Sequence, residues 1–372
     1  MADVELRRTP LHGLHAALGG RMVAFAGYAM PLQFTGIIRE HVHTRTRASL
    51  FDVSHMGQVR LAGVAAAAGL ESLMPADVVD LRPGRQRYGF FTNDAGGIRD
   101  DLMVANVGDA LLLVVNAATK AADIEHLRAH LSDACTIDVL TGRALLALQG
   151  PAAARVLRRH VPAVDSLAFM SVTHARLAAA DCYVSRSGYT GEDGFEISVP
   201  AEAAETLARA LLDHADVAPA GLGARDSLRL EAGLCLYGHD LDERTTPVEA
   251  SLGWAVSKAR RPGGARAGGY PGARVIEREL QRGAARRRVA LLPEGRAPVR
   301  EGAGLASDTG ARVGVVTSGG FGATLGAPVA MGYVEVAWSA PGTALTAHVR
   351  GRPLAVQVAE MPVVPHRYAA PA

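Results

Sequence analysis

The stretch Ala259–Gly272, ARRPGGARAGGYPG, divides the chain into two regions of different character. Its density of Gly, Pro and Arg is typical of a linker, because Gly and Pro interrupt regular structure. Before this stretch, strand-like and helix-like segments alternate, whereas most of the chain after it consists of short strands. We therefore expect an α+β part over residues 1–260, a linker over 261–284 and a β-rich domain over 285–372.

The region after the linker begins with one helix-like piece, Ala273–Gln281, and then shows five strand-like segments separated by Gly and Pro. These segments are Arg287–Leu292, Ala311–Thr317, Val329–Val336, Ala344–Val349 and Leu354–Val358. Short strands at this spacing predict a small antiparallel barrel or sandwich. We expect the arginine run 286–288 to be a solvated strand edge, where basic residues prevent unwanted pairing.

The first 260 residues show both helical and strand periodicity. The expected helices are Pro10–Leu18, Arg39–Leu50, Ala118–Leu131 and Ala201–His214, and the expected strands are Gly57–Leu61, Arg87–Thr92, Ile98–Ala105, Ala110–Val115 and Ala144–Leu148. The segment NDAGG at 93–97 is rich in turn-forming residues and should reverse the chain.

Length, charge and cysteine content exclude several classes of protein. A chain of 372 residues predicts two or three domains. Its net charge of +2, from 39 basic and 37 acidic residues, does not provide the basic excess typical of nucleic-acid binding. Three scattered cysteines are too few for a disulfide framework. No segment has the length of a membrane span or the apolar core of a secretory signal, so we expect a cytoplasmic protein with no membrane or nucleic-acid partner.

Several familiar motifs are absent or misplaced. The glycines of Gly320–Gly322 are followed by Pro328 and another strand rather than by a helix, which favours a turn over a phosphate loop. No HExxH occurs, and the spacing of His41 and His43 does not suit the helix that contains them. We therefore expect no metal site.

Four polar clusters occupy loops and strand ends, where a scaffold can present functional groups. They are FDVSHMG at 51–57, GGIRDDL at 96–102, SRSGYTGEDGFE at 185–196, and GLGARDSLRLEAG at 221–233 with the tyrosine that follows at 237. Together they supply acids, arginines and tyrosines. Such a set could bind a flat, polar aromatic ligand that carries carboxylates.

At these clusters, and at TSGGFGATLG (317–326), the chain resembles the glycine cleavage T protein family. The similar blocks occur in the family's order and extend from Thr9 to about Tyr368. The resemblance implies a three-lobed cloverleaf, with two α+β lobes and a C-terminal antiparallel β-barrel around a central folate channel. It also implies transfer of a one-carbon unit from the aminomethyl-lipoyl arm of the H protein to tetrahydrofolate, which gives 5,10-methylenetetrahydrofolate, ammonia and dihydrolipoyl H protein.

The resemblance further implies a set of site residues. Asp101 falls on the family's essential aspartate, and Glu196 and Arg225 fall on folate-binding positions. The remaining expected pocket residues are Tyr88, Met56, Asn116, Tyr189, Tyr237 and, at the C-terminus, Tyr368. Tetrahydrofolate would be a co-substrate, with no metal. We expect Asp101 mainly to orient folate and stabilise a cation, because a carboxyl group with an ordinary pKa is a poor proton donor at neutral pH.

Three alternatives remain. A folate-dependent demethylase of the same superfamily, acting on a small methylated amine or sulfonium, would share the folate site but not the lipoyl partner. An iron–sulfur assembly paralogue would carry KGCYxGQE, whereas the corresponding stretch 234–240 is LCLYGHD. A folate-binding module without catalysis would be expected to lack Asp101, which is present.

Overall fold

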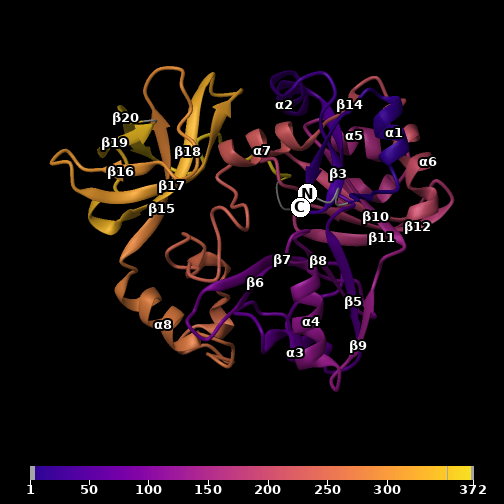
Figure 1. The fold of residues 1–372 in the computed structure, drawn as a ribbon. Coiled ribbons are helices and arrows are strands. Elements are labelled where there is room, and N and C mark those ends of the chain that lie inside the picture. The colour runs from indigo at the N-terminus through magenta and orange to yellow at the C-terminus, as the bar shows by residue number, and fades with distance from the viewer. Residues whose placement is uncertain (1–4, 350, 370–372) are drawn as a thin grey trace.

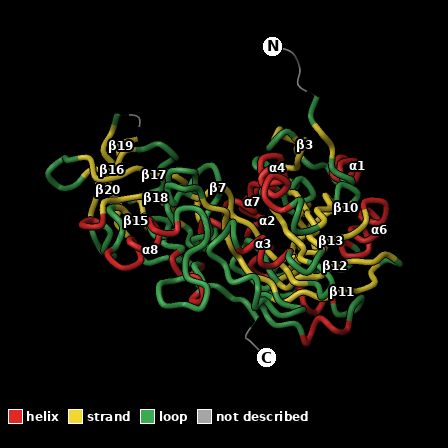
Figure 2. Tube along the Cα trace, turned by 90° about the horizontal axis from the view of Figure 1, so that it is seen from below, coloured by secondary structure: helices red, strands yellow, loops and turns green. Residues whose placement is uncertain are grey.

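The chain leaves its first large sheet after a single strand, builds a second sheet, and then returns to complete the first. The computed structural model describes residues 5–349 and 351–369. Figure 1 shows the result as three parts around a centre: two mixed parts formed by these sheets, and a third formed by the C-terminal strands. In the view from below, the C-terminal strands and the first sheet lie at opposite sides, with β7 (Ile98–Asn106) and α7 (Leu222–Glu231) between them (Figure 2).

The first mixed part contains a six-stranded sheet in the order β11-β12-β13-β10-β4-β14. Its strands are β4 (Ala48–Asp52), β10 (Arg143–Gln149), β11 (Ser171–Leu177), β12 (Ala180–Arg186), β13 (Gly194–Pro200) and β14 (Val217–Pro219). The associated helices are α1 (His12–Ala17), α2 (Ile37–Thr46), α5 (Ala153–Leu157) and α6 (Ala201–Leu212). A small sheet of β1 (Arg7–Arg8), β3 (Tyr28–Gln33) and β2 (Arg21–Phe25) precedes it.

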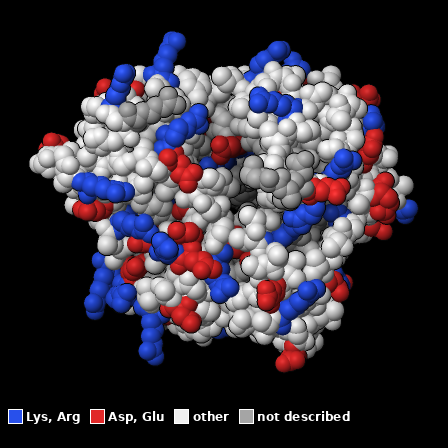
Figure 3. All heavy atoms as spheres, viewed as in Figure 1, with Lys and Arg blue, Asp and Glu red and all other residues white. Residues whose placement is uncertain are grey.

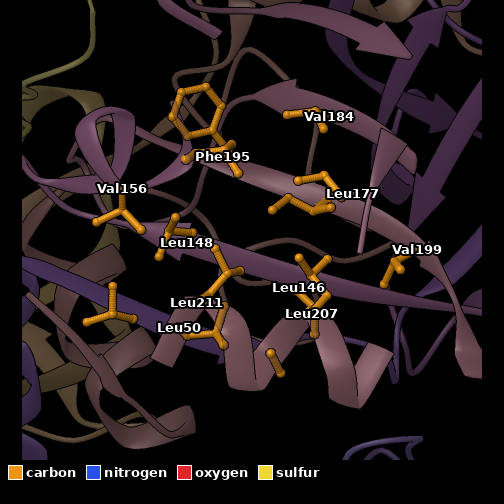
Figure 4. Packing of buried hydrophobic residues seen from close by; sticks show 14 of the residues in the cluster. Leu50, Leu146, Leu148, Val156, Leu177, Val184, Phe195, Val199, Leu207 and Leu211 are labelled. Atoms are coloured by element: carbon orange, nitrogen blue, oxygen red, sulfur yellow. The ribbon is translucent and has the colours of Figure 1, made fainter. Parts of the chain in front are cut away.

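The core of this part lies between the sheet and α6. Leu207 and Leu211 lie four residues apart on the helix and are fully buried, so they share the face that packs on the sheet. They contact the leucines of β10, Leu146 and Leu148, as Figure 4 shows. This apolar layer holds β13 and β10 in fixed register, and it thereby positions the side chains on the other face of the sheet.

The second mixed part contains a five-stranded sheet in the order β6-β7-β8-β5-β9. Its elements are β5 (Gly57–Ala62), α3 (Ala66–Glu71), β6 (Gln86–Thr92), β7, β8 (Leu111–Val115), α4 (Lys120–Leu131) and β9 (Thr136–Val139). The strands β6, β7 and β8 are antiparallel neighbours, and the predicted turn at 93–97 joins the first two. Two buried leucines of α4, Leu127 and Leu131, pack in the core of this sheet.

The third part is a closed barrel in the order β15-β18-β17-β16-β19-β20, with every pair antiparallel. Its strands are β15 (Arg286–Pro293), β16 (Gly304–Ala306), β17 (Arg312–Gly322), β18 (Ala327–Glu335), β19 (Ala344–Val349) and β20 (Arg352–Ala359). The five predicted strands are present, and the barrel rather than the sandwich is correct. The sequence did not reveal β16, because three residues are too short to show a period.

One local prediction was wrong, and a second was correct only in part. The expected helix Arg39–Leu50 ends at Thr46 as α2, and the next residues form β4. Every residue of β4 is buried between β10 and β14, and such a central strand lacks the alternation that distinguishes a strand from a buried helix. The arginine run is a solvated edge only in part: β20 pairs with β15 from Ala290 onward and Arg287 is exposed, but the backbone N–H of Arg288 donates to the Glu249 oxygen at 2.8 Å. Arg288 is buried and donates to the backbone oxygens of Ala250 and Gly233, each at 2.9 Å.

The segment between α7 and the barrel is packed against the second mixed part, at Glu71 of α3. Arg260 is buried and donates to Glu71 Oε1 at 3.1 Å and to the Glu71 backbone oxygen at 3.0 Å. Arg266 donates to the same Oε1 at 2.7 Å. The helix that follows, α8 (Ala273–Arg282), inserts Ile276 beside Ile98 of β7. None of the helices in the described part of the chain has both the length and the apolar character of a membrane span.

Replacing Arg260 with alanine should destabilise the protein by about 3 kcal/mol, because it leaves a buried carboxylate with one partner fewer. Urea unfolding of the variant and the wild type measures this loss. Arg209→Ala is the matched control, since Arg209 forms an exposed pair with Glu205 at 2.7 Å and should cost at most about 1 kcal/mol. Equal losses in the two variants would contradict a buried anchor at Arg260.

Candidate active site

The site is built around two adjacent carboxyl groups, Asp100 and Asp101, on β7. Asn116 follows the neighbouring strand β8 directly, and the register Leu102↔Val115 brings it opposite the two acids. Its Nδ2 group donates to Asp101 Oδ1 at 2.8 Å and to Asp100 Oδ1 at 2.9 Å. One side-chain amide therefore fixes the orientation of both carboxyl groups.

Tyr88, on β6, holds the other oxygen of Asp101. Its hydroxyl donates to Asp101 Oδ2 at 3.0 Å. The Tyr88 ring stacks with Trp254 at a centroid distance of 5.7 Å, and Trp254 is 66% exposed. Trp254 was not identified from the sequence. Its rarity could have indicated it, because the chain has only two tryptophans and 5% aromatic residues.

Burial and a neighbouring charge change the acidity of Asp101. Burial and, to a lesser extent, the negative charge of Asp100 raise its pKa to about 7, while the hydrogen bonds from Tyr88 and Asn116 act in the opposite direction. From the sequence we assumed an ordinary pKa for Asp101, and we therefore ranked orientation of folate and stabilisation of a cation above proton donation. At a pKa near 7, Asp101 can both hold and release a proton at neutral pH.

Glu196 and Arg225 supply a second group of charges. Glu196, on β13, accepts a hydrogen bond from Ser187 Oγ at 2.9 Å and lines a narrow cavity with Met103 of β7. Arg225, on α7, lies over the ring of Tyr189 at 4.6 Å. Its Nη1 atom is buried and has no hydrogen-bond partner among the described residues. Burial lowers the pKa of Arg225, and the charge of Glu196 counteracts this effect.

Three further expected residues lie at this site. The Tyr189 hydroxyl donates to the backbone oxygen of Cys235, and the Tyr237 hydroxyl donates to that of Ile98 at 3.3 Å. Burial raises the pKa of both phenols. Met56 is partly buried and packs with Ala224 of α7, the residue before Arg225. The two tyrosines and Met56 are therefore held by backbone and apolar contacts beside the charged groups.

Tyr368 occupies a different position. Its ring stacks on Phe169 at 4.0 Å, and the neighbouring Arg367 donates its backbone N–H to the Gly191 oxygen at 2.8 Å. Burial raises the pKa of Tyr368 to about 12. The contacts of Tyr368 within the described chain do not join it to Asp101 or Arg225. The C-terminal segment nevertheless lies against the loop that carries Tyr189.

Two buried residues near the site were not singled out from the sequence. His55 is 5% exposed, and burial together with the charge of Arg225 lowers its pKa to about 4. Asp123, on α4, is 3% exposed and faces Asp100. His55 lay inside the quoted FDVSHMG cluster, whereas Asp123 lay in a helix with no distinguishing neighbours. Only the fold brings Asp123 to the strand that carries the paired acids.

The centre of the molecule is hollowed where the three parts meet. Figure 3 shows this hollow between the barrel and the two mixed parts, with acidic side chains at its edge. No three His, Cys, Asp or Glu side chains among the residues the structure describes are grouped to hold a metal ion. The hollow and the half-buried acid with a pKa near neutrality are features of an enzyme that binds an organic substrate.

Comparison with known proteins identifies the class as an aminomethyltransferase-type fold. The family model for the GCVT N-terminal domain matches residues 11–260, and that for the glycine cleavage T-protein C-terminal barrel domain matches residues 286–365. The chain belongs to the glycine cleavage T protein family.

Relatives cover nearly the whole chain. Mitochondrial aminomethyltransferase from Homo sapiens is 46% identical over 99% of this chain and 92% of its own length. The Dictyostelium discoideum enzyme of the same name is 42% identical over 98% and 94%. The crystal structure of glycine cleavage system aminomethyltransferase T from Bartonella henselae has a TM-score of 0.91 and 43% identity, covering 98% of this chain and 100% of that one.

The raised pKa of Asp101 predicts a pH-dependent stability. Because the folded-state pKa of about 7 exceeds the ordinary value of 3.8, the protonated form favours folding. This contribution is complete below about pH 4 and is lost as the pH rises through about 7. In Asp101→Asn, the decline in the free energy of unfolding between pH 4 and 8 should shrink by roughly 2–4 kcal/mol.

Denaturant unfolding at a series of pH values measures this difference. Asp94→Asn is the control, because Asp94 is exposed in the turn before β7. Asp94→Asn should show the same change in the free energy of unfolding with pH as the wild type. If Asp101→Asn also shows the wild-type change, Asp101 titrates in its ordinary range.

Proposed function

We propose that this protein is the aminomethyltransferase of the glycine cleavage system. It takes the aminomethyl group from the lipoyl arm of the H protein and passes the carbon to tetrahydrofolate. The products are 5,10-methylenetetrahydrofolate, ammonia and dihydrolipoyl H protein. The observation that carries this proposal is the half-buried Asp101, held by Asn116 and Tyr88 at a pKa near neutrality beside the hollow.

Folate binding is assigned to the second group of charges. A pterin ring presents an amino group and a ring N–H side by side, which match the two oxygens of the Glu196 carboxylate. The unpartnered Nη1 of Arg225 offers a donor to a carbonyl or carboxylate of the same ligand. Tyr88, Tyr189, Tyr237 and Met56 would line the pocket. Tyr368 would contribute only through the C-terminal segment against the Tyr189 loop.

The carbon gives up its bonds to the lipoyl sulfur and to the amine nitrogen and forms bonds to two folate nitrogens. Each of these folate nitrogens loses a proton, and the leaving amine and the sulfur each gain one. Protonated Asp101 can supply the proton that the amine gains, and the resulting carboxylate can accept a proton from a folate nitrogen and stabilise the cation that forms between the two steps. Tyr88 and Asn116 keep both oxygens aimed during this cycle.

The direct test mixes the purified protein with aminomethylated H protein and tetrahydrofolate and follows ammonia. We expect ammonia and methylenetetrahydrofolate in equal amounts. Dimethylglycine, sarcosine and a methylated sulfonium are offered in parallel. Demethylation of one of these without ammonia release from the H protein would replace the proposal with the demethylase alternative.

We also propose a cytoplasmic location, with neither a membrane nor a nucleic-acid partner. The eukaryotic relatives carry the description mitochondrial.

Asp101→Asn should abolish formation of methylenetetrahydrofolate while folate still binds. The amide keeps the shape of the side chain but cannot give or take the proton. Turnover and folate affinity are measured on the same preparation, with Asp94→Asn as the control. Turnover near the wild-type level would overturn the assignment of Asp101.

Glu196→Ala should weaken tetrahydrofolate binding at least tenfold, or by about 1.4 kcal/mol, because a charged hydrogen-bond pair is lost. Isothermal titration calorimetry measures the affinity. Glu202→Ala is the matched control, since Glu202 is an exposed acid on α6, just after the strand that carries Glu196. Unchanged affinity in Glu196→Ala would remove this residue from the folate site.

A further inference from the structure

A narrow cavity lies where the sheets of the two mixed parts face each other. Its volume is about 20 Å³, which accommodates one or two water molecules. Pockets for organic ligands have roughly 300 Å³ or more, so a pterin ring cannot enter it. One wall includes Gln86, Met103 and Ala105 of the second sheet, and the other includes Ser185 and Glu196 of the first. Glu196, the proposed pterin ligand, therefore also borders a space that only small molecules such as water can occupy.

The register of the strands fixes the side chains around this cavity. Gln86 pairs with Ala105 between β6 and β7, so their side chains share one face of the second sheet. Ser185 pairs with Glu196 between β12 and β13, so these two share one face of the first sheet. Ala105 also packs with Val172 of β11, and this contact joins the two faces. Backbone pairing thus places an amide opposite a carboxylate across the cavity.

Gln86 is a buried amide that lacks a strong partner. Its side chain is 6% exposed. Among the described residues, its one side-chain hydrogen-bond contact runs from Nε2 to the thioether of Met170 at 4.0 Å, and the amide oxygen has no donor. A thioether is a weak acceptor, and a buried amide without hydrogen bonds is unfavourable. Gln86 therefore needs a polar partner that the cavity can supply.

Glu196 has a place for the same partner. Ser187 Oγ donates to Glu196 Oε2 at 2.9 Å, and Oε1 has no donor among the described residues. A carboxylate offers about four lone-pair sites, and the pterin amino and ring N–H groups would take one on each oxygen. Ser187 takes a second site on Oε2, and the second site on Oε1 remains for a donor in the cavity. A water molecule can donate to Oε1 and accept from the Gln86 amide or the Ser185 hydroxyl.

We propose that an ordered water molecule in this cavity joins the Gln86 amide to the Glu196 carboxylate, and that Gln86 is thereby a positioning residue for folate binding. Ser187 and the water hold one oxygen each, so the carboxylate keeps the orientation that bidentate pairing requires. Because Gln86 belongs to β6, the bridge also ties the second sheet to the folate site of the first. This inference rests on the proposed function, because folate is the ligand assigned to Glu196.

The first experiment needs neither activity nor folate. Crystal structures of the wild type and Gln86→Leu are compared at a resolution that shows ordered water. We expect a water molecule within about 3.2 Å of both the Gln86 amide and the Glu196 carboxylate in the wild type, and its loss in Gln86→Leu. Gln281→Leu is the matched control, because Gln281 is an exposed glutamine on α8, and it should retain the water. A wild-type cavity without this water, or the same water in Gln86→Leu, would overturn the proposal.

The second experiment measures the affinity for tetrahydrofolate by calorimetry. Gln86→Leu should weaken binding at least about threefold through the loss of the bridge. Ala105→Val should do the same, because its two added methyl groups displace the water while Gln86 is retained. In a Glu196→Ala background, Gln86→Leu should change the affinity less than about 1.5-fold, because Gln86 acts only through Glu196.

Two results of this cycle would contradict the bridge. One is an equal effect of Gln86→Leu in both backgrounds, which would mean that Gln86 acts independently of Glu196. The other is wild-type affinity in both Gln86→Leu and Ala105→Val. If the wild type does not bind tetrahydrofolate at all, the proposed function fails, and the crystal structures still decide whether a water molecule joins Gln86 to Glu196.

Discussion

A single side-chain amide, that of Asn116, holds the two adjacent carboxyl groups of β7 in place. Two buried acids side by side repel each other when both are ionised, and that arrangement persists only where donors compensate the charge. Asn116 supplies such donors to Asp100 and Asp101 at once, from the first position after β8. The antiparallel pairing of β7 with β8 is therefore the constraint on which the geometry of the site depends.

A second, larger network joins the first mixed part to the barrel through α7. Arg45 of α2 donates to Glu192 Oε1 and to Glu231 Oε2, each at 3.0 Å. The other oxygen of Glu231 accepts the backbone N–H of Thr324 at 2.8 Å, in the turn between β17 and β18. One buried carboxylate thus connects the first mixed part, α7 and the barrel. Gly320–Gly322, which resembled a phosphate loop in the sequence and were expected to form a turn, are the end of β17. The turn that follows presents the N–H groups of Thr324 and Leu325 to a carboxylate of the protein itself.

The sequence predicted most of the fold, because the periodic strands of the barrel and the motif-bearing turns are local signals. It failed at β4 and at Arg288, where burial on all sides removed the pattern that identifies a strand or an edge. The family resemblance named Tyr88, Asn116 and Asp101 as candidate site residues, and the structure joins them by hydrogen bonds. The acidity of Asp101 was not predictable, because it depends on burial and on contacts between distant elements.

Burial and the charge of Asp100 make Asp101 an acid that titrates near neutrality. The most direct measurement is a titration of the aspartate side chains by 13C NMR in the free protein, with the Asp101 resonance assigned by its absence in Asp101→Asn. We expect a midpoint near pH 7 for this resonance. A midpoint near the ordinary value of 3.8 would contradict it, because Asp101 would then be fully ionised at neutral pH with no proton to give.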